Sequence, residues 1–228
     1  MGTRGAYGFR INGKDKITYN HYDSYPSYLG SSILGFIEET PIEDMKSIAE
    51  KITLIINQDA APSEQDISRY KDFMDLEVSK QSEKDWYCLL RKAQGNLNIY
   101  KNPSFLHMID NHDFLLDSLF CEWAYIINLD EKALEIYTGF NKNRHAKGRY
   151  ASGKDPQSDK DYYGVALVVS IPLSALKEDK EGAVKIVRCS DFSQIPYGKE
   201  TKKEIIEMLG ASDSPEKSKR VLKVQESV

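Results

Sequence analysis

The chain has 228 residues, a formal net charge of −4 and 40% hydrophobic residues. This length supports one well-buried core. The sequence contains neither a run of roughly 18 apolar residues that could span a membrane nor an apolar secretory signal at its N-terminus. Its acidic balance excludes the global positive field on which non-specific nucleic-acid binding depends. We therefore expect a cytoplasmic protein without a membrane or nucleic-acid partner, whose three widely spaced cysteines are free thiols.

The first predicted element is a β-hairpin. Residues 6–11 and 15–22 alternate between apolar and polar side chains on either side of Asn12-Gly13, a strong hairpin signal. A two-residue loop would give Phe9 a charged partner, whereas a three-residue loop would place it opposite Ile17. Matching of apolar faces across the strands favours the three-residue loop.

A helical insertion is predicted between this hairpin and the later strands, over about residues 26–120. Apolar residues recur there at helical spacing after proline or capping residues. The predicted helices begin at Pro26, at the capping box Thr40–Glu43, at Ser63 and at Ser82–Asp85, and the second of them extends to Ile55. A further helix is predicted over 104–120.

The later part of the chain returns to β-structure. Residues 122–130 and 133–137 are predicted to form an antiparallel hairpin, followed by strands over 162–171 and 184–188. The capping box Thr201–Glu204 predicts the start of a last helix, which ends at Gly210. These elements predict a single α+β domain over 1–210 with a mainly antiparallel sheet, and a flexible polar tail over 211–228.

The end of the first hairpin carries more polar side chains than a turn requires. Residues 19–26 have the sequence Tyr-Asn-His-Tyr-Asp-Ser-Tyr-Pro. The predicted register separates the side chains near this end into two sets: Thr3, Gly5, His21 and Asp23 on one face, and Arg4, Asn20 and Tyr22 on the other. The helix predicted from Pro26 would present unpaired N–H groups here, which suit an anion. An ordinary helix N-cap formed by Asp23 or Ser24 is the alternative.

The same opening distantly resembles that of amidohydrolases with an N-terminal nucleophile, in which a Thr, Ser or Cys uses its own α-amine as the base. Thr3 would be the nucleophile after cleavage of the Gly2–Thr3 bond. His21 and Asp23 would be its polar partners across the hairpin. This resemblance implies an amide hydrolase.

A cationic loop is predicted at 141–150, after the second hairpin. It contains Arg144, His145, Lys147 and Arg149, although the whole chain is acidic. Arginine side chains in such a loop suit a phosphate or carboxylate group because they form bidentate contacts. A solvated connection that balances nearby acidic residues is the alternative.

Two parts of the sequence resemble a family of uncharacterised proteins of bacteriophages and other large DNA viruses. The first is the opening Met-Gly-Thr-Arg-Gly with the stretch 19–26 and Leu29-Gly30. The second is Glu122-Trp-Ala-Tyr with the later Leu134-Glu-Ile-Tyr and Gly-Phe140. The resemblance implies no established activity. It implies a viral accessory protein in the host cytoplasm that binds host molecules and counters host defence.

Our leading hypothesis is a protein that binds an anionic, nucleotide-like small molecule or a host protein. The candidate ligand-binding residues are Arg4, Asn20, His21, Tyr25, Arg144, His145, Lys147 and Arg149. The alternatives are an amide hydrolase with Thr3, His21 and Asp23 as catalytic residues, and a structural or assembly protein of the virion. We predict no cofactor. We also predict no metal site, because His107 and His112 are five residues apart and do not match the i,i+4 spacing of helical metal ligands.

Overall fold

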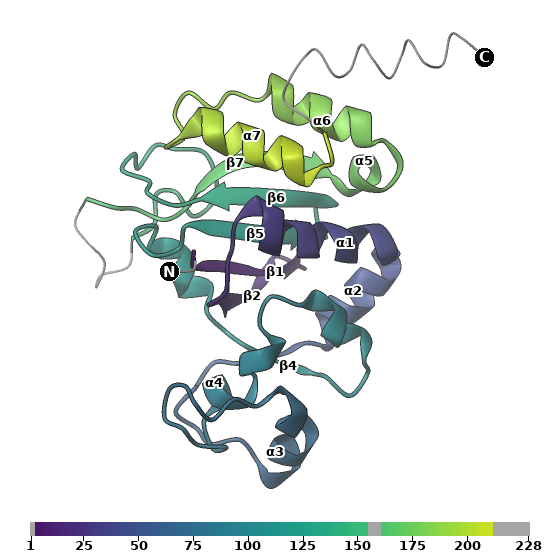
Figure 1. The fold of residues 1–228 in the computed structure, drawn as a ribbon, viewed down its shortest axis with the longest axis vertical. Helices are drawn as coiled ribbons and strands as arrows, with labels where there is room; N and C mark the ends of the chain where they lie inside the picture. The colour runs from purple at the N-terminus through teal and green to yellow at the C-terminus, as the bar shows by residue number, and fades with distance from the viewer. Residues whose placement is uncertain (1–2, 155–160, 212–228) are drawn as a thin grey trace.

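A five-stranded sheet forms the centre of the computed structural model, which describes residues 3–154 and 161–211. The strands lie in the order β2-β1-β5-β6-β7 (Figure 1). Their bounds are Gly5–Ile11 for β1, Lys14–Asn20 for β2, Trp123–Asn128 for β5, Ala133–Thr138 for β6 and Ala166–Pro172 for β7. Only β1 and β5 are parallel neighbours in this sheet. The predicted α+β fold with a mainly antiparallel sheet is confirmed.

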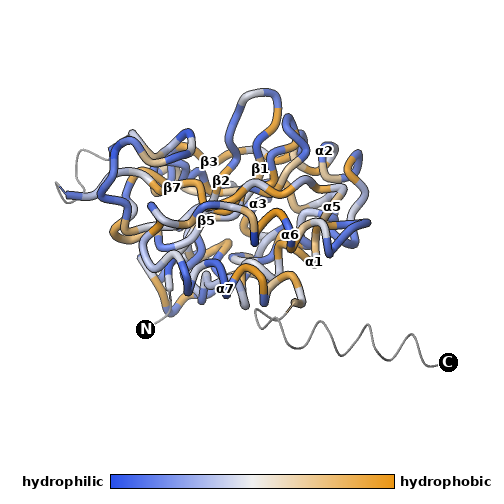
Figure 2. Tube along the Cα trace, turned by 90° about the horizontal axis from the view of Figure 1, so that it is seen from above, coloured by the Kyte–Doolittle hydropathy of each residue, from blue (hydrophilic) through white to orange (hydrophobic). Residues whose placement is uncertain are grey.

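Helices cover one face of this sheet. A π-helix, Pro26–Gly30, leads into α1 (Ser31–Glu39), and three helices follow the last strand: α5 (Leu173–Glu178), α6 (Lys180–Cys189) and α7 (Gly198–Met208). Figure 1 shows α1 and α7 in front of the strands, and Figure 2 shows apolar segments running through the centre of the molecule. Among the described residues, no helix has the length and apolarity needed to cross a membrane.

The rest of the predicted helical insertion lies at and beyond the β2 edge. It contains α2 (Ile42–Lys51), α3 (Glu64–Tyr70) and α4 (Trp86–Leu89), with α3 and α4 in the lower part of Figure 1. It also contains a parallel pair of short strands, β3 (Thr53–Ile55) and β4 (His107–Ile109). Short 3₁₀-helices complete it: Lys71–Phe73, Arg91–Ala93, Leu97–Lys101 and His112–Leu116.

The register of the first hairpin differs from the prediction. Asn12 and Gly13 form a two-residue turn, both with positive φ, and Phe9 is paired with Lys16 while Ile17 is paired with Gly8. The longer predicted loop is therefore wrong. Asn-Gly strongly favours the two-residue turn because both residues tolerate φ > 0 at its centre.

Two separate cores explain why this register is stable. Phe9 packs in the large core under the helices, whereas Ile17 packs on the opposite face with Ala6, Ile126 and Tyr137. Side chains directly opposite each other in a sheet share a face, so pairing Phe9 with Ile17 would have placed one of them in the wrong core. Lys16 is tolerated on the helix-covered face because its Nζ donates to the carbonyl of Ile52 at 2.6 Å.

Two predicted capping boxes do not form. The α2 helix has Pro41 as its N-cap without a side-chain bond, and the buried Thr40 Oγ1 has no hydrogen-bond partner within the described part of the chain. Thr201 lies inside α7, which already begins at Gly198. By contrast, Ser63 caps α3 as predicted, because its side chain accepts from the backbone N–H of Asp66.

Three predicted elements have a different secondary structure. The helix expected to reach Ile55 ends at Lys51, and the helix expected over 104–120 is replaced by β4 and a 3₁₀-helix. Here parallel pairing between β3 and β4 overrides helical spacing. The strand expected over 184–188 lies within α6, where Ala183, Val184 and Val187 form one buried helical face. The predicted tail falls outside the described residues from 212 onwards.

Candidate functional site

An open hollow lies where β2 ends and the π-helix follows. Its volume is about 560 Å³. We call it the rim pocket and define it by the residues that line it: Asn20, His21, Tyr22, Asp23, Tyr28, Leu29, Ser32, Gln94 and Gly95. The pocket thus combines the polar stretch singled out in the sequence with a distant segment around Gln94, which sequence analysis did not connect to it.

The observed register rearranges the side chains at this edge. Gly5 is paired with Asn20, and the N–H of Ser24 donates to the carbonyl of Thr3 at 3.0 Å. A shift of one residue moves every side chain of a strand to the other face. The predicted grouping of Gly5 with His21, and of Thr3 with Asp23, is therefore wrong.

Asn20 supplies an unused hydrogen-bond acceptor. The side chain is 1% exposed, and its Nδ2 donates to the Tyr22 carbonyl and to Ser24 Oγ, both at 2.9 Å. Because a carbonyl only accepts, this contact fixes which end of the amide is the nitrogen. The remaining Oδ1 is buried and has no partner within the described residues. Such an orphaned acceptor is costly unless water or a ligand donates to it.

His21 lies in a positive electrostatic field. Its backbone N–H donates to Gln94 Oε1 at 3.2 Å, and its Nδ1 lies 3.0 Å from the Tyr19 hydroxyl. Burial lowers the pKa of His21, and the charges of Arg91 and Arg4 lower it further. The imidazole is therefore mostly in its neutral form at pH 7. The positive charges of Arg91 and Arg4 act on it from outside the pocket lining, whose one charged side chain is Asp23.

Arg91 is the functional candidate that sequence analysis missed. It is 5% exposed, its guanidinium lies 4.4 Å from the centre of the Tyr22 ring, and its Nη1 donates to Gln94 Oε1 at 2.7 Å. Its Nε is buried without a partner in the described part of the chain. The signal in the sequence was weak: Arg91 and Lys92 both lie between the apolar Leu90 and Ala93 of a predicted helix. Arginine is rarely buried unless it is paired, so the sequence gave no reason to expect Arg91 inside the protein.

The catalytic candidates of the hydrolase hypothesis do not all line the rim pocket. Thr3 is 3% exposed and is not among the residues that line the rim pocket, whereas His21 and Asp23 are. Within residues 3–154, no hydrogen bond joins the Thr3 side chain to either of them. The guanidinium of Arg4 lies over the Phe120 ring, 4.5 Å from its centre.

The cationic loop does not line the rim pocket. Arg144, His145 and Lys147 are exposed, and Arg149 forms a bidentate pair with the buried Glu135 at 2.9 and 2.5 Å. Tyr25, also predicted at the ligand, lines a different hollow. Of the eight predicted ligand-binding residues, only Asn20 and His21 line the rim pocket.

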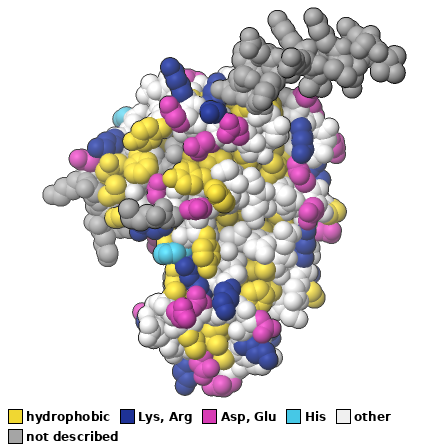
Figure 3. All heavy atoms as spheres, in the orientation of Figure 1, with side chains coloured by type: hydrophobic (Ala, Val, Ile, Leu, Met, Phe, Trp, Pro, Cys, Tyr) yellow, Lys and Arg dark blue, Asp and Glu magenta, His cyan; other side chains and the backbone are white. Residues whose placement is uncertain are grey.

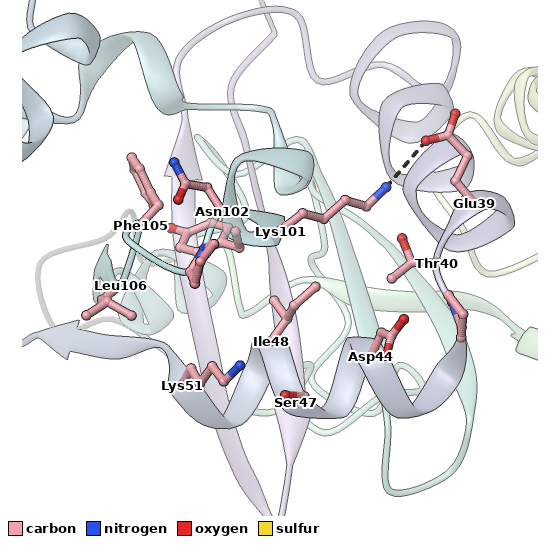
Figure 4. A pocket seen from close by; sticks show the side chains of 13 residues that line it. Glu39, Thr40, Asp44, Ser47, Ile48, Lys51, Lys101, Asn102, Phe105 and Leu106 are labelled. Atoms are coloured by element: carbon pink, nitrogen blue, oxygen red, sulfur yellow. Dashed lines mark hydrogen bonds and ion pairs between the residues drawn. The ribbon is translucent and has the colours of Figure 1, made fainter.

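Another hollow, of about 360 Å³, lies between the α1–α2 corner and residues 100–106 (Figure 4). Its lining includes Asp44 and Lys51, and Lys101 points toward Glu39, with Nζ 3.4 Å from a carboxylate oxygen. The charges that line it are of both signs and partly paired with each other. They give no preference for one ligand charge.

Comparison of the chain with protein-family models, with curated proteins and with solved structures finds no match. These comparisons therefore assign no function, and the geometry of the rim pocket is the structural basis for inferring one.

Proposed function

We propose that this protein binds an anionic small molecule with a planar, nucleotide-like ring at the rim pocket. The observation that carries the proposal is the buried Arg91, which lies behind Tyr22 and, with Arg4, makes the potential at His21 positive. An anion would gain from this local field although the chain as a whole has a net charge of −4.

The pocket also offers surfaces for a ring. Tyr22 and Tyr28 line it and are 47% and 62% exposed. Arg91 covers one face of the Tyr22 ring, so the opposite face and the Tyr28 ring are the surfaces proposed for a stacking partner. Aromatic side chains stack on planar rings in offset or edge-to-face geometry.

Binding can be tested with adenosine and its mono-, di- and triphosphates by thermal shift and isothermal titration calorimetry. We expect affinity to increase with phosphate charge, and we expect Tyr28→Ala or Gln94→Ala to weaken it about tenfold, the size of one lost stacking or hydrogen-bond contact. Arg144→Ala and Lys147→Ala are matched controls, because these cations are exposed in the loop and do not line the pocket. Equal effects of loop and pocket variants, or no binding by any of these probes, would contradict the proposal.

The resemblance to viral proteins suggests that this binding activity acts on host molecules during infection. A small protein that sequesters a host nucleotide-like molecule, or binds a host protein through the same surface, would counter host defence. Capture from host lysate followed by mass spectrometry of small molecules and proteins tests this setting. The hydrolase alternative makes a separate prediction for intact mass: loss of both Met1 and Gly2 that Thr3→Ala abolishes.

A further inference from the structure

A hollow separate from the rim pocket is lined by aromatic and acidic side chains. It lies where β5 begins and β6 ends, beside the N-terminal part of α7, and its volume is about 240 Å³. We call it the aromatic hollow, and it shares no lining residue with the rim pocket. In Figure 3, hydrophobic side chains gather on the upper part of the molecule in the region of α7, with acidic side chains among them.

Four aromatic rings line the aromatic hollow: Tyr25, Trp123, Phe140 and Tyr197. Phe140 and Tyr197 meet edge to face with their centres 6.4 Å apart, and Trp123 is stacked on Tyr125 at 6.2 Å. Tyr197 is 73% exposed, so most of its side chain is open to solvent beside the Phe140 ring. Trp123 is thus packed against Tyr125, whereas Tyr197 leaves one side of the hollow open to solvent.

Two of these aromatic residues have a strained backbone. Phe140 has φ of 55° and Tyr197 has φ of 53°, in the left-handed region that bulky L-residues rarely adopt. A hydrogen bond from the Phe140 N–H to the Ser118 carbonyl at 2.7 Å holds the first in place. Strain that persists at neighbouring residues of one hollow is typical of sites where side-chain position matters for function.

The charged side chains that line the aromatic hollow are all acidic: Glu122, Glu200 and Glu204. Burial raises the pKa of Glu204, and the carboxylates of Glu207 and Glu200 raise it further. Burial also raises the pKa of Glu122, against the opposing charge of Arg4. The nearby Lys202 is turned away, because its Nζ donates to the carbonyls of Arg188 and Ser190.

We propose that the aromatic hollow binds a methylated ammonium group, either the head of a choline-like molecule or a trimethyllysine side chain. Aromatic faces attract such a cation through their negative quadrupole, and carboxylates that have lost solvent gain most from a neighbouring positive charge. The volume is below the roughly 300–1,000 Å³ typical of drug-sized ligands. It therefore suits a single head group.

Calorimetric titration with choline and with its neutral isostere 3,3-dimethylbutanol tests the charge requirement. The two probes have nearly the same shape, so only the charge separates them. We expect choline to bind about tenfold more tightly, as cation–π and carboxylate contacts together imply. Equal binding of both probes, or no binding of choline at millimolar concentration, would overturn the proposal. Parallel titrations with a trimethyllysine peptide and its unmodified counterpart distinguish a protein partner from a free metabolite.

Two variants assign the binding to this hollow. Tyr197→Asn removes the ring but keeps a residue that tolerates positive φ, so the fold is retained and choline binding is expected to fall at least fivefold. Glu204→Gln removes one carboxylate and is expected to weaken choline without affecting the isostere. Tyr28→Ala in the rim pocket is the matched control and should leave choline binding unchanged. Full binding by Tyr197→Asn, with an unchanged melting temperature, would contradict the assignment.

Discussion

At the scale of single residues, Arg149, which the sequence suggested as a ligand-binding residue, pairs with the buried Glu135. The Glu135 side chain is 8% exposed, and its carboxylate accepts from Arg149, from Asn128 Nδ2 at 2.8 Å and from the Tyr137 hydroxyl at 2.9 Å. A buried carboxylate needs such partners because desolvation of a charge is costly. Arg149 is therefore committed to Glu135.

We expect Arg149→Met to destabilise the fold by about 3 kcal/mol, because it leaves the Glu135 charge buried without its cation. Urea unfolding monitored by circular dichroism measures this change. Arg144→Met, in the same loop but exposed, is the control and should change stability by less than about 0.5 kcal/mol. The double variant Glu135→Gln with Arg149→Met should recover part of the loss. If it does not, the unpaired charge is not the cause.

The titration of His21 is a second prediction at this scale. Burial and the charges of Arg91 and Arg4 lower its pKa, so the folded state resists protonation more than the unfolded state does. Stability contributed by neutral His21 is therefore present above about pH 6.5 and decreases as the pH falls below that value. NMR titration of the imidazole should show the lowered pKa, and Arg4→Gln should raise it. An unchanged pKa in that variant would contradict the contribution of Arg4.

At the scale of elements, the turns of the two hairpins are joined. The backbone N–H groups of Asn12 and Gly13 donate to the Asp130 carboxylate at 2.7 and 2.9 Å. Asp130 follows β5, and Leu129 N–H donates to the Arg10 carbonyl at 2.9 Å. This contact between distant turns aligns β1 with β5, the parallel pair that brings the hairpins into one sheet.

Substitution of two glycines in the first helical segment, Gly30 at the end of the π-helix and Gly35 in the middle of α1, is expected to have opposite effects on stability. A Cβ on Gly30 would lie 2.7 Å from Met208 Sδ and 3.0 Å from a Tyr125 ring carbon, whereas a Cβ on Gly35 meets nothing within 4 Å. We expect Gly30→Ala to destabilise by about 1–3 kcal/mol through overpacking. Gly35→Ala should stabilise by about 0.5–1 kcal/mol because alanine favours the helix. Thermal melting of both variants tests this, and a stabilising Gly30→Ala would show that α7 does not pack this closely.

At the scale of the whole molecule, the insertion and the sheet share one core. Tyr70, Trp86 and Phe105 from the insertion belong to the same buried cluster as Tyr7 and Phe9 from the sheet. A continuous core favours cooperative unfolding. The single domain over 1–210 stays a prediction, and cooperative unfolding is the behaviour expected of it.

The two tryptophans make that cooperativity measurable. Trp86 lies in α4 of the insertion and Trp123 in β5 of the sheet. We expect Trp123→Phe, which leaves Trp86 as the fluorescent probe, to give the same urea midpoint by fluorescence as by circular dichroism. Trp86→Phe leaves Trp123 as the fluorescent probe of the sheet, and its urea midpoints by fluorescence and by circular dichroism should also be equal. Two distinct midpoints within either variant would show that the insertion unfolds separately.

Local sequence patterns were enough to predict the fold class, the hairpins at 6–22 and 122–137 and the helix after Ser63, because alternation, Asn-Gly and side-chain caps act between near neighbours. The hairpin register agrees with the local Asn-Gly turn, but the matching of apolar residues misled the prediction because Phe9 and Ile17 belong to different cores on opposite faces of the sheet. Tertiary packing explains that pairing. It also decided the β3–β4 pair and the place of Arg91 behind Tyr22. These features join residues far apart in the chain, and local patterns carry no information on which distant partner a residue will contact.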